Sequence, residues 1–450
     1  MSEPENTSRC QACLRCFLPV HFTREIVNLC SLALPVFLSY LFDYLIIFVS
    51  TVFCGHLGKV ELDGVTLATA AINVMGICIG YGLSAACDTL ISQAFGAGNL
   101  HLVGVITQKA VLILLLACLP CCALLINTES VLLLVGQSPE VARVSQLYVD
   151  IFLPGLPAAF MFIIEAKYLQ NQGKTWPLVI TGVVANVLNA LINYIFLFVL
   201  DMGVTGSAAA NTISQYSLAI ILLIYIRCTG LHKDTWPGWS MDCLQEWDSF
   251  IHLALPSMLM MCAEWWTYEI GGLLADPYRL QCRRQCESGE CYGSRRRCSS
   301  QALCQTLNNL CRDIRMRVAT VMVLFAPFHL LDSTAAAGGS IVKGLGKQKI
   351  GAVCNLVGFV LVGFPIGISL MFAAKWGVFG AQEDGGNTEG RDLDMATDMD
   401  GLLDEQADVL LATVRVQLPL SALVLRRGLV VAAMLALLAA GLAVRFFLKR

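Results

Sequence analysis

Ten long apolar stretches constrain what this 450-residue chain can fold into more than any other feature. A helix needs about 20 apolar residues to cross about 30 Å of hydrocarbon, where every backbone group must be paired within the protein. Hydrophobic residues make up 56% of the sequence and charged residues only 14%, so the chain is predicted to be an all-α, polytopic membrane protein. The stretches lie near residues 27–53, 64–91, 103–126, 148–169, 178–200, 205–226, 251–275, 318–342, 350–374 and 428–448.

The distribution of positive charge orients the first seven predicted spans. If the N-terminus is cytoplasmic, the inside segments hold eight Lys and Arg residues and the outside loops hold two. Because cytoplasmic loops carry an excess of positive charge, we expect residues 1–26 to form a cytoplasmic head and 230–250 a cytoplasmic linker. The eight are Arg9, Arg15, Arg24, Lys109, Lys167, Lys174, Arg227 and Lys233, and the two are Lys59 and Arg143.

The chain also resembles itself at a period of about 173 residues. Gly173-Lys174 opens an apolar helix that is followed by Gly203-Val204, and Gly346-Lys347 opens another that is followed by Gly377-Val378. Many secondary transporters consist of two bundles related by such an internal repeat. We therefore predict two related helical bundles, of which the first contains six helices.

Residues 276–317 interrupt the second bundle, because they are polar and rich in Arg and Cys. The loop at Ala94 to Asn99 (AFGAGN) should have a partner near residue 290. When Arg279 to Cys304 is back-translated with permitted codons and read in a frame shifted by one base, the resulting amino-acid sequence contains AMGAGD. A frame-shifted or mispredicted exon therefore explains the segment, which we expect to be disordered, and the second bundle is predicted to be incomplete.

The cysteines of this segment allow another interpretation, in which they bind zinc or form disulfides. They contain no CxxC pair and their spacing is irregular, whereas structural zinc sites favour close pairs. We therefore predict no metal site and no cofactor. The cysteines are Cys282, Cys286, Cys291, Cys298, Cys304 and Cys311.

The predicted organisation follows from these features. Residues 382–408 contain ten acidic residues and a single basic one, Arg391, so they are expected to form a solvated loop. The chain shows no basic face large enough to indicate a nucleic-acid partner. In order, we predict a head (1–26), the first bundle (27–229), a linker (230–250), the incomplete second bundle (251–380), an acidic loop (381–425) and a C-terminal transmembrane helix (426–450).

Ionisable side chains inside spans are costly, which makes them functional candidates. Five stand out: Asp43, Glu165, Glu264, Glu269 and Asp332. Glu264 and Glu269 are five residues apart on one helix, about 140° around its axis, so they could line two sides of a cavity. We interpret Asp43 and Glu165 as structural.

Aromatic residues surround the two glutamates of the seventh span. Trp265, Trp266 and Tyr268 offer ring faces that attract organic cations, so carboxylates and aromatics together indicate a cation site. In an alternative interpretation the glutamates hydrogen-bond neighbouring helices and the tryptophans sit at the membrane interface.

Three long motifs carry a family resemblance. They run from Ser50 to Lys59 (STVFCGHLGK), from Cys87 to Gln93 (CDTLISQ) and from Pro256 to Glu269 (PSMLMMCAEWWTYE). With these motifs, residues 50–275 closely resemble the multidrug and toxin extrusion transporters, specifically the animal organic-cation/proton antiporters. Residues 425–428 and the last helix look like that family's additional C-terminal span.

The resemblance implies twelve core helices in two bundles and a thirteenth helix, of which the eighth, ninth and twelfth are missing here. It implies roles for Glu264 and Glu269 in substrate recognition and proton coupling. Asp332 falls where the family has a glutamate, beside a histidine matched by His329. Cys54 matches a family cysteine associated with sensitivity to thiol reagents, although a packed thiol explains it equally well.

The implied function is export of organic cations and drugs in exchange for protons, at the plasma membrane and specifically the apical membrane of epithelial cells. A carboxylate in a low-dielectric cavity binds a proton more readily than one in water, so proton and cation would compete. No GxxxxGK[ST] loop for ATP occurs, and the chain is predicted not to be an enzyme. Sodium coupling stays open. The alternative is a truncated or misspliced product that does not transport.

Overall fold

The structure is a computed structural model that describes residues 22–236, 238–290, 332–363, 365 and 420–448. Within these ranges every regular element is a helix, so the predicted all-α class is confirmed. The helices form two compact units, of residues 1–68 with 128–237 and of residues 69–127 with 238–450. The helix α3 (Lys59–Ile72) contributes residues to both units.

Seven helical runs in the described part of the chain are long and apolar enough to cross a membrane. They overlap the first six predicted spans and the last one, which confirms the polytopic character of the chain. The runs are Ala33–Gly55, Lys59–Gly96, Leu100–Leu125, Pro139–Gln170, Trp176–Val199, Gly203–Cys228 and Leu425–Phe447.

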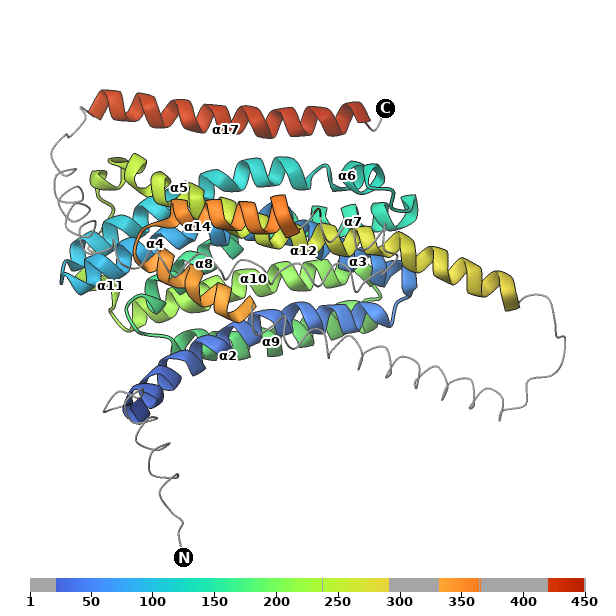
Figure 1. The fold of residues 1–450 in the computed structure, drawn as a ribbon, viewed down its shortest axis with the longest axis horizontal. Helices are drawn as coiled ribbons and strands as arrows, with labels where there is room; N and C mark the ends of the chain where they lie inside the picture. The colour runs from blue at the N-terminus through green and yellow to red at the C-terminus, as the bar shows by residue number, and fades with distance from the viewer. Residues whose placement is uncertain (1–21, 237, 291–331, 364, 366–419, 449–450) are drawn as a thin grey trace, which may run out of the picture. The chain divides into compact units, whose positions relative to one another are not determined.

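The first unit is built around α10 (Gly203–Cys228). This helix packs against α2 (Phe22–Gly55), α7 (Pro139–Phe152), α8 (Leu156–Gln170) and α9 (Trp176–Tyr194), and α2 lies along α9 (Figure 1). Buried small residues explain why α10 can be surrounded, since small side chains let helices approach closely. They are Gly206, Ser207, Ala208, Ala210 and Ser214.

A close approach holds α2 against α9. A Cβ atom placed on Gly182 would lie only 2.7 Å from the Cβ of Phe42, so no larger residue fits at this position. One turn along α9, Asn186 Nδ2 donates a hydrogen bond of 2.8 Å to the carbonyl oxygen of Phe42. The glycine therefore brings the helices near enough for a side chain to bond the neighbouring backbone.

Further along α9, buried amides and hydroxyls join α2, α9 and α10. Ser50 Oγ donates to Asn189 Oδ1 at 3.3 Å, and Asn189 Nδ2 donates to Ser214 Oγ at 3.0 Å. Asn193 Nδ2 donates to Ser50 Oγ at 3.3 Å. Such bonds hold helices together in lipid, where the hydrophobic effect does not drive them to associate.

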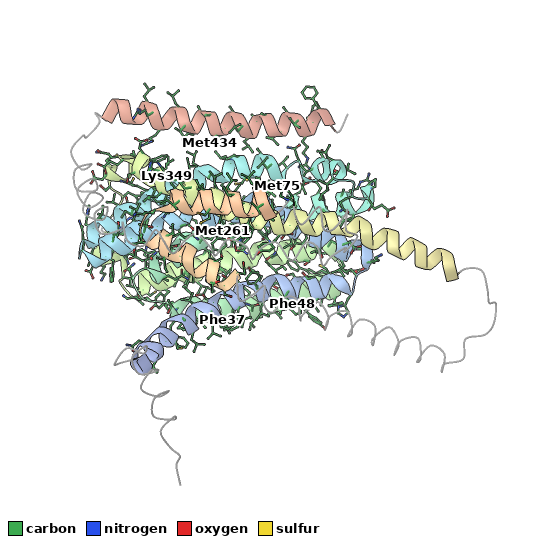
Figure 2. The ribbon with its side chains drawn as sticks, viewed as in Figure 1. Phe37, Phe48, Met75, Met261, Lys349 and Met434 are labelled. Carbon is green, nitrogen blue, oxygen red and sulfur yellow. The ribbon has the colours of Figure 1, made fainter. Side chains whose placement is uncertain are left out.

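The outer face of α2 is apolar. Phe37 and Phe48 are 62% and 63% exposed, and both project away from the helix (Figure 2). Large apolar side chains that are this exposed along a whole helix would be unfavourable in water, whereas they suit contact with lipid tails.

The second unit has α12 (Trp247–Glu290) at its centre. This helix packs against α4 (Cys78–Gly96) and α14 (Gln348–Asn355), while α5 (Leu100–Leu125) packs against α4. The predicted span 251–275 lies within α12. Residues 332–344 are helical, and α14 continues as the π-helix η5 (Leu356–Gly363). The remainder of the predicted spans 318–342 and 350–374 lies outside the described residues.

The C-terminal helix α17 (Leu420–Leu448), drawn in red in Figure 1, packs along α5. Near its start, Arg427 lies over the Trp247 ring, 4.1 Å from the ring centroid, and Arg427 Nε donates to the carbonyl oxygen of Leu244 at 3.1 Å. Near its end, Asn127 Nδ2 donates to the carbonyl oxygen of Gly441 at 3.0 Å. The start of α17 therefore lies beside the segment that is predicted to be a cytoplasmic linker.

One expectation about residues 276–317 is wrong. The helix α12 does not end near residue 275 but continues to Glu290, so the first part of the segment is helical rather than disordered (Figure 1). Pro277 disfavours a helix at this point, but Leu280 and the Arg and Gln residues between 279 and 285 are good helix formers and favour its continuation. Residues 291–317 lie outside the described ranges.

The two Gly-Lys turns of the internal repeat share a backbone conformation. Gly173 has a φ of +72° and Gly346 a φ of +70°, which a residue with a side chain rarely adopts. Each turn leads into a helix that ends in a π-helical segment, η3 (Ile195–Val199) in one unit and η5 in the other. The sequence similarity at this period therefore corresponds to similar local structure.

Candidate functional site

Four of the predicted site residues lie within two turns of α12. Glu264, Trp265, Tyr268 and Glu269 are each half-buried or partly exposed, so they border accessible space in the second unit. The fifth, Asp332, is the first described residue of the helix over residues 332–344 and belongs to the same unit.

The structure brings Asp332 to the aromatic part of α12. Tyr268 Oη donates a hydrogen bond of 3.3 Å to Asp332 Oδ1. The Tyr268 ring also meets the Phe359 ring edge to face, with centroids 6.2 Å apart. These two contacts hold Tyr268 between the helix over residues 332–344 and η5, and they bring a third carboxylate near Glu264.

The neighbouring tryptophans contact the segment that precedes and begins α4. The rings of Trp265 and Tyr81 lie 6.2 Å apart at an angle of 41°. Trp266 Nε1 donates to the carbonyl oxygen of Val74 at 3.0 Å, within the π-helix η1 (Asn73–Ile77). A π-helical turn leaves carbonyl groups without their usual partners, which explains why an indole can bond there.

Neither glutamate of α12 has a hydrogen bond or a salt bridge with another residue in the described part of the chain. The charged groups that act on Glu264 are Asp332 and Lys343. Two carboxylates in a half-buried setting, beside exposed aromatic edges, form an arrangement that can attract and hold a cation.

A buried polar cluster supports the site from one side. Gln348, which is 1% exposed, donates through Nε2 to Thr89 Oγ1 at 3.0 Å and accepts from Ser257 Oγ at 2.7 Å. Thr89 Oγ1 in turn donates to the carbonyl oxygen of Lys343 at 2.7 Å. The cluster ties α4, α12 and α14 to the end of the helix over residues 332–344, and each of its side chains is hydrogen-bonded, which favours one fixed packing.

Sequence reasoning missed several of these residues. Tyr81 is one aromatic residue inside a long apolar stretch, and no pattern distinguishes it from a lipid-facing side chain. Lys343 follows a Gly- and Ala-rich stretch and was not recognised as a neighbour of a membrane carboxylate. Gln348 directly follows the repeated Gly-Lys pair, which is the one signal that could have found it.

Two predicted site residues are not part of this group. Cys54 is fully buried in α2 of the first unit, and His329 lies outside the described residues. Asp43 is partly exposed on α2, while Glu165 is 7% exposed on α8. Oε2 of Glu165 has no hydrogen-bond partner within the described ranges.

Among the described residues, no group of three or more His, Cys, Asp or Glu side chains could hold a metal ion. The side chains of the six cysteines at 282–311 fall outside what the structure describes. The candidate site therefore consists of carboxylates and aromatic rings.

Most of the chain is similar in sequence to animal multidrug and toxin extrusion proteins. Multidrug and toxin extrusion protein 1 of Danio rerio is 54% identical over 419 residues, which cover 82% of this chain and 71% of that protein. The protein of the same name from Homo sapiens is 45% identical over 414 residues, with 81% and 73% covered. Residues 35–195 match the family model MatE.

Solved structures share the fold. The crystal structure of the eukaryotic MATE transporter AtDTX14 superposes with a TM-score of 0.65 at 23% identity, covering 80% of this chain and 92% of that one. A crystal structure of MATE in the bent conformation gives a TM-score of 0.56 at 14% identity, covering 79% and 90%. Members of this family are transporters and not enzymes. On the identity and coverage of these relatives, the chain belongs to the multidrug and toxin extrusion family of membrane transporters.

Proposed function

We propose that this chain exports organic cations and drugs in exchange for protons, and that Glu264 and Glu269 bind both in turn. The observation that carries the proposal is that both carboxylates lie in the second unit without a hydrogen bond or salt bridge to another described residue, beside Trp265 and Tyr268. The names of the similar proteins from fish and man support a drug or toxin as cargo.

The aromatic rings favour a bulky organic cation over a small hydrated one. Trp265 and Tyr268 are each held by a second ring, from Tyr81 and Phe359 respectively, so their orientation is set before a ligand arrives. A quaternary ammonium ion can lie over such a ring face and still feel a nearby carboxylate. A flat aromatic surface tolerates many shapes, which suits a transporter of many drugs.

Exchange with protons follows from competition for the same oxygen atoms. A carboxylate that binds a proton loses the charge that holds the organic cation, so protonation from the outside releases the cargo. Loss of that proton to the inside restores an anionic site for the next cation. Asp332 shares the hydroxyl of Tyr268, so a change in its charge also changes the polarity of the ring that meets the cargo.

Several finer points belong to the same proposal. The expected location is the plasma membrane, specifically the apical membrane of epithelial cells, where such export would discharge drugs from the cell. His329 and Cys54 stay predicted contributors. The partners are small organic cations, protons and the lipid bilayer, with no nucleic acid.

The test is uptake of tetraethylammonium into proteoliposomes that contain the full chain. We expect an outwardly directed proton gradient to drive uptake, with or without sodium, and Glu264→Gln to reduce that uptake at least tenfold. Glu165→Gln is the matched control, because it neutralises an intramembrane acid of the first unit and should retain uptake. Gradient-driven uptake that persists in Glu264→Gln would refute the coupling role. A wild-type chain with no uptake at all would favour the truncated, non-transporting product.

A further inference from the structure

The contact between α4 and α12 follows a regular antiparallel register. At one point a Cβ atom on Gly82 would lie 2.4 Å from the Cα of Met258, so the two backbones are in direct contact there. Four residues earlier on α4 and four later on α12, Cys78 faces Cys262. After four more residues in each direction, the carbonyl oxygen of Val74 accepts from the Trp266 indole.

The two cysteines in the middle of this register are close and buried. Their sulfur atoms lie 3.7 Å apart, and Cys78 and Cys262 are 0% and 6% exposed. A cysteine in an apolar run usually acts as a small hydrophobic residue. These two, however, come from segments 184 residues apart and meet where the helices cannot slide past each other freely.

We propose that Cys78 and Cys262 form a disulfide when the protein meets a thiol oxidant, and that this bond stops transport by fixing α12 to α4. Glu264 lies two residues beyond Cys262 on the same helix, so a covalent bond here restrains the helix that carries the cation site. The effect on transport rests on the proposed function, whereas formation of the bond does not.

The geometry permits the bond with a small movement. A disulfide places its sulfur atoms about 2.05 Å apart, so the two atoms must approach by roughly 1.6 Å. The π-helical turn η1 directly precedes Cys78 and gives the chain a local means of adjustment, since such turns interrupt the regular helical bonding.

The chemistry balances with a two-electron oxidant. With diamide, a membrane-permeable diazene, one thiol adds to the N=N bond and the second thiol displaces it. The two sulfur atoms become joined, and the diazene takes up the two protons and two electrons that the thiols lose, which makes it a hydrazine. A hydroperoxide would act through a sulfenic acid on one cysteine, which the other then attacks with loss of water. Because buried thiols react slowly, we expect a small apolar oxidant to act faster than a charged one.

Other cysteines of the second unit provide the controls. Cys118 and Cys122 have sulfur atoms 4.0 Å apart, but they are four residues apart on α5, so a bond between them would join the helix only to itself. Cys121 is buried in the same unit and close enough to interact with both Cys78 and Cys262, so it is the competing partner for a bond. Variants of these residues therefore distinguish a disulfide between α4 and α12 from general oxidation of thiols.

The test uses the purified full chain in proteoliposomes, treated with diamide and then with iodoacetamide. Mass spectrometry of the digest should find one peptide pair joined through Cys78 and Cys262, and dithiothreitol should remove it. Tetraethylammonium uptake should fall at least fivefold with oxidation and recover on reduction. Cys78→Ser and Cys262→Ala should both keep their uptake after diamide, while Cys118→Ser should lose it as the unmodified chain does.

Several results would overturn the inference. If the joined peptide is absent when all exposed thiols have been oxidised, Cys78 and Cys262 do not form the bond. A peptide pair joined through Cys121 instead would lead to the same conclusion. Loss of uptake that persists in Cys78→Ser would place the sensitive thiol elsewhere. If the chain transports nothing, the joined peptide still decides whether the bond forms, so failure of the proposed function and failure of this inference give different results.

Discussion

Substitution of Gly82 by alanine tests the packing on which the site depends. The added methyl group would lie 2.4 Å from the Cα and 3.1 Å from the Cβ of Met258, and a backbone atom cannot rotate away as a side chain can. Ordinary contact between carbon atoms needs at least about 3.5 Å. The helices α4 and α12 must therefore separate by roughly 1 Å, or the substitution cannot be accommodated.

The expected cost follows from two opposing effects. Overpacking of a buried contact typically costs about 1–3 kcal/mol. Alanine is also a better helix former than glycine by about 0.5–1 kcal/mol, which offsets part of the cost. We expect a net loss of about 1–2 kcal/mol, and a larger one if the separation breaks the hydrogen bond between Trp266 and Val74.

The assay is thermal unfolding of the detergent-purified chain followed by tryptophan fluorescence. Gly96→Ala is the matched control, because it lies on the same helix and its added Cβ would meet nothing within 4 Å. We expect the apparent Tm to fall by about 1–2 °C for Gly82→Ala and to stay or rise for Gly96→Ala. Equal melting of the two variants would refute the close contact. The yield of the Cys78–Cys262 bond should also fall in Gly82→Ala only.

Three further substitutions test other contacts. Gln348→Leu should lower the apparent Tm by about 1–3 °C, because Thr89 and Ser257 would each lose the hydrogen bond to Gln348, at about 0.5–1.5 kcal/mol per bond. Lys349→Leu on the exposed side of α14 should change little. Similar melting of the two variants would contradict the role of the cluster. Arg427→Leu should make α17 more susceptible to limited proteolysis, since it removes a cation–π contact of about 0.5–2 kcal/mol and a hydrogen bond. Arg426→Leu should not have this effect. Equal cleavage of the two variants would argue against the contact at the start of α17. Tyr268→Phe keeps the ring and loses only the hydrogen bond to Asp332, so the KM for tetraethylammonium should rise only a few-fold. Tyr268→Ala also removes the ring and should raise the KM more. An equal rise in both variants would show that the ring itself contributes nothing.

The spans and the general nature of the site could be predicted from the sequence. An apolar run of about 20 residues has few alternatives to a helix in lipid, because its backbone groups find no partner outside the segment. An acid within such a run is equally informative, because its charge is costly there unless it has a use. This is why the order of residues alone is enough to predict Glu264 and Glu269 as candidate site residues, together with the aromatic residues between and around them.

Which helices meet could not be read in the same way. A helix in a membrane is apolar on both its lipid side and its packed side, so hydrophobic periodicity does not mark the face that contacts a neighbour. Tyr81 and Phe359 therefore look like any other aromatic residues until the fold places them against Trp265 and Tyr268. The contact surfaces depend instead on single glycines, such as Gly82, whose effect is visible only when the opposing backbone is known.

Amino-acid order alone thus establishes that the chain is a bundle of membrane helices with acids and aromatic rings on one of them. Only the three-dimensional packing groups α4 and α5 with α12, which is far from them in sequence. So do the meeting of Cys78 with Cys262 and the position of Arg427 over Trp247. The physical reason is that burial in lipid depends on each helix alone, whereas packing depends on how the shapes of two distant segments fit together.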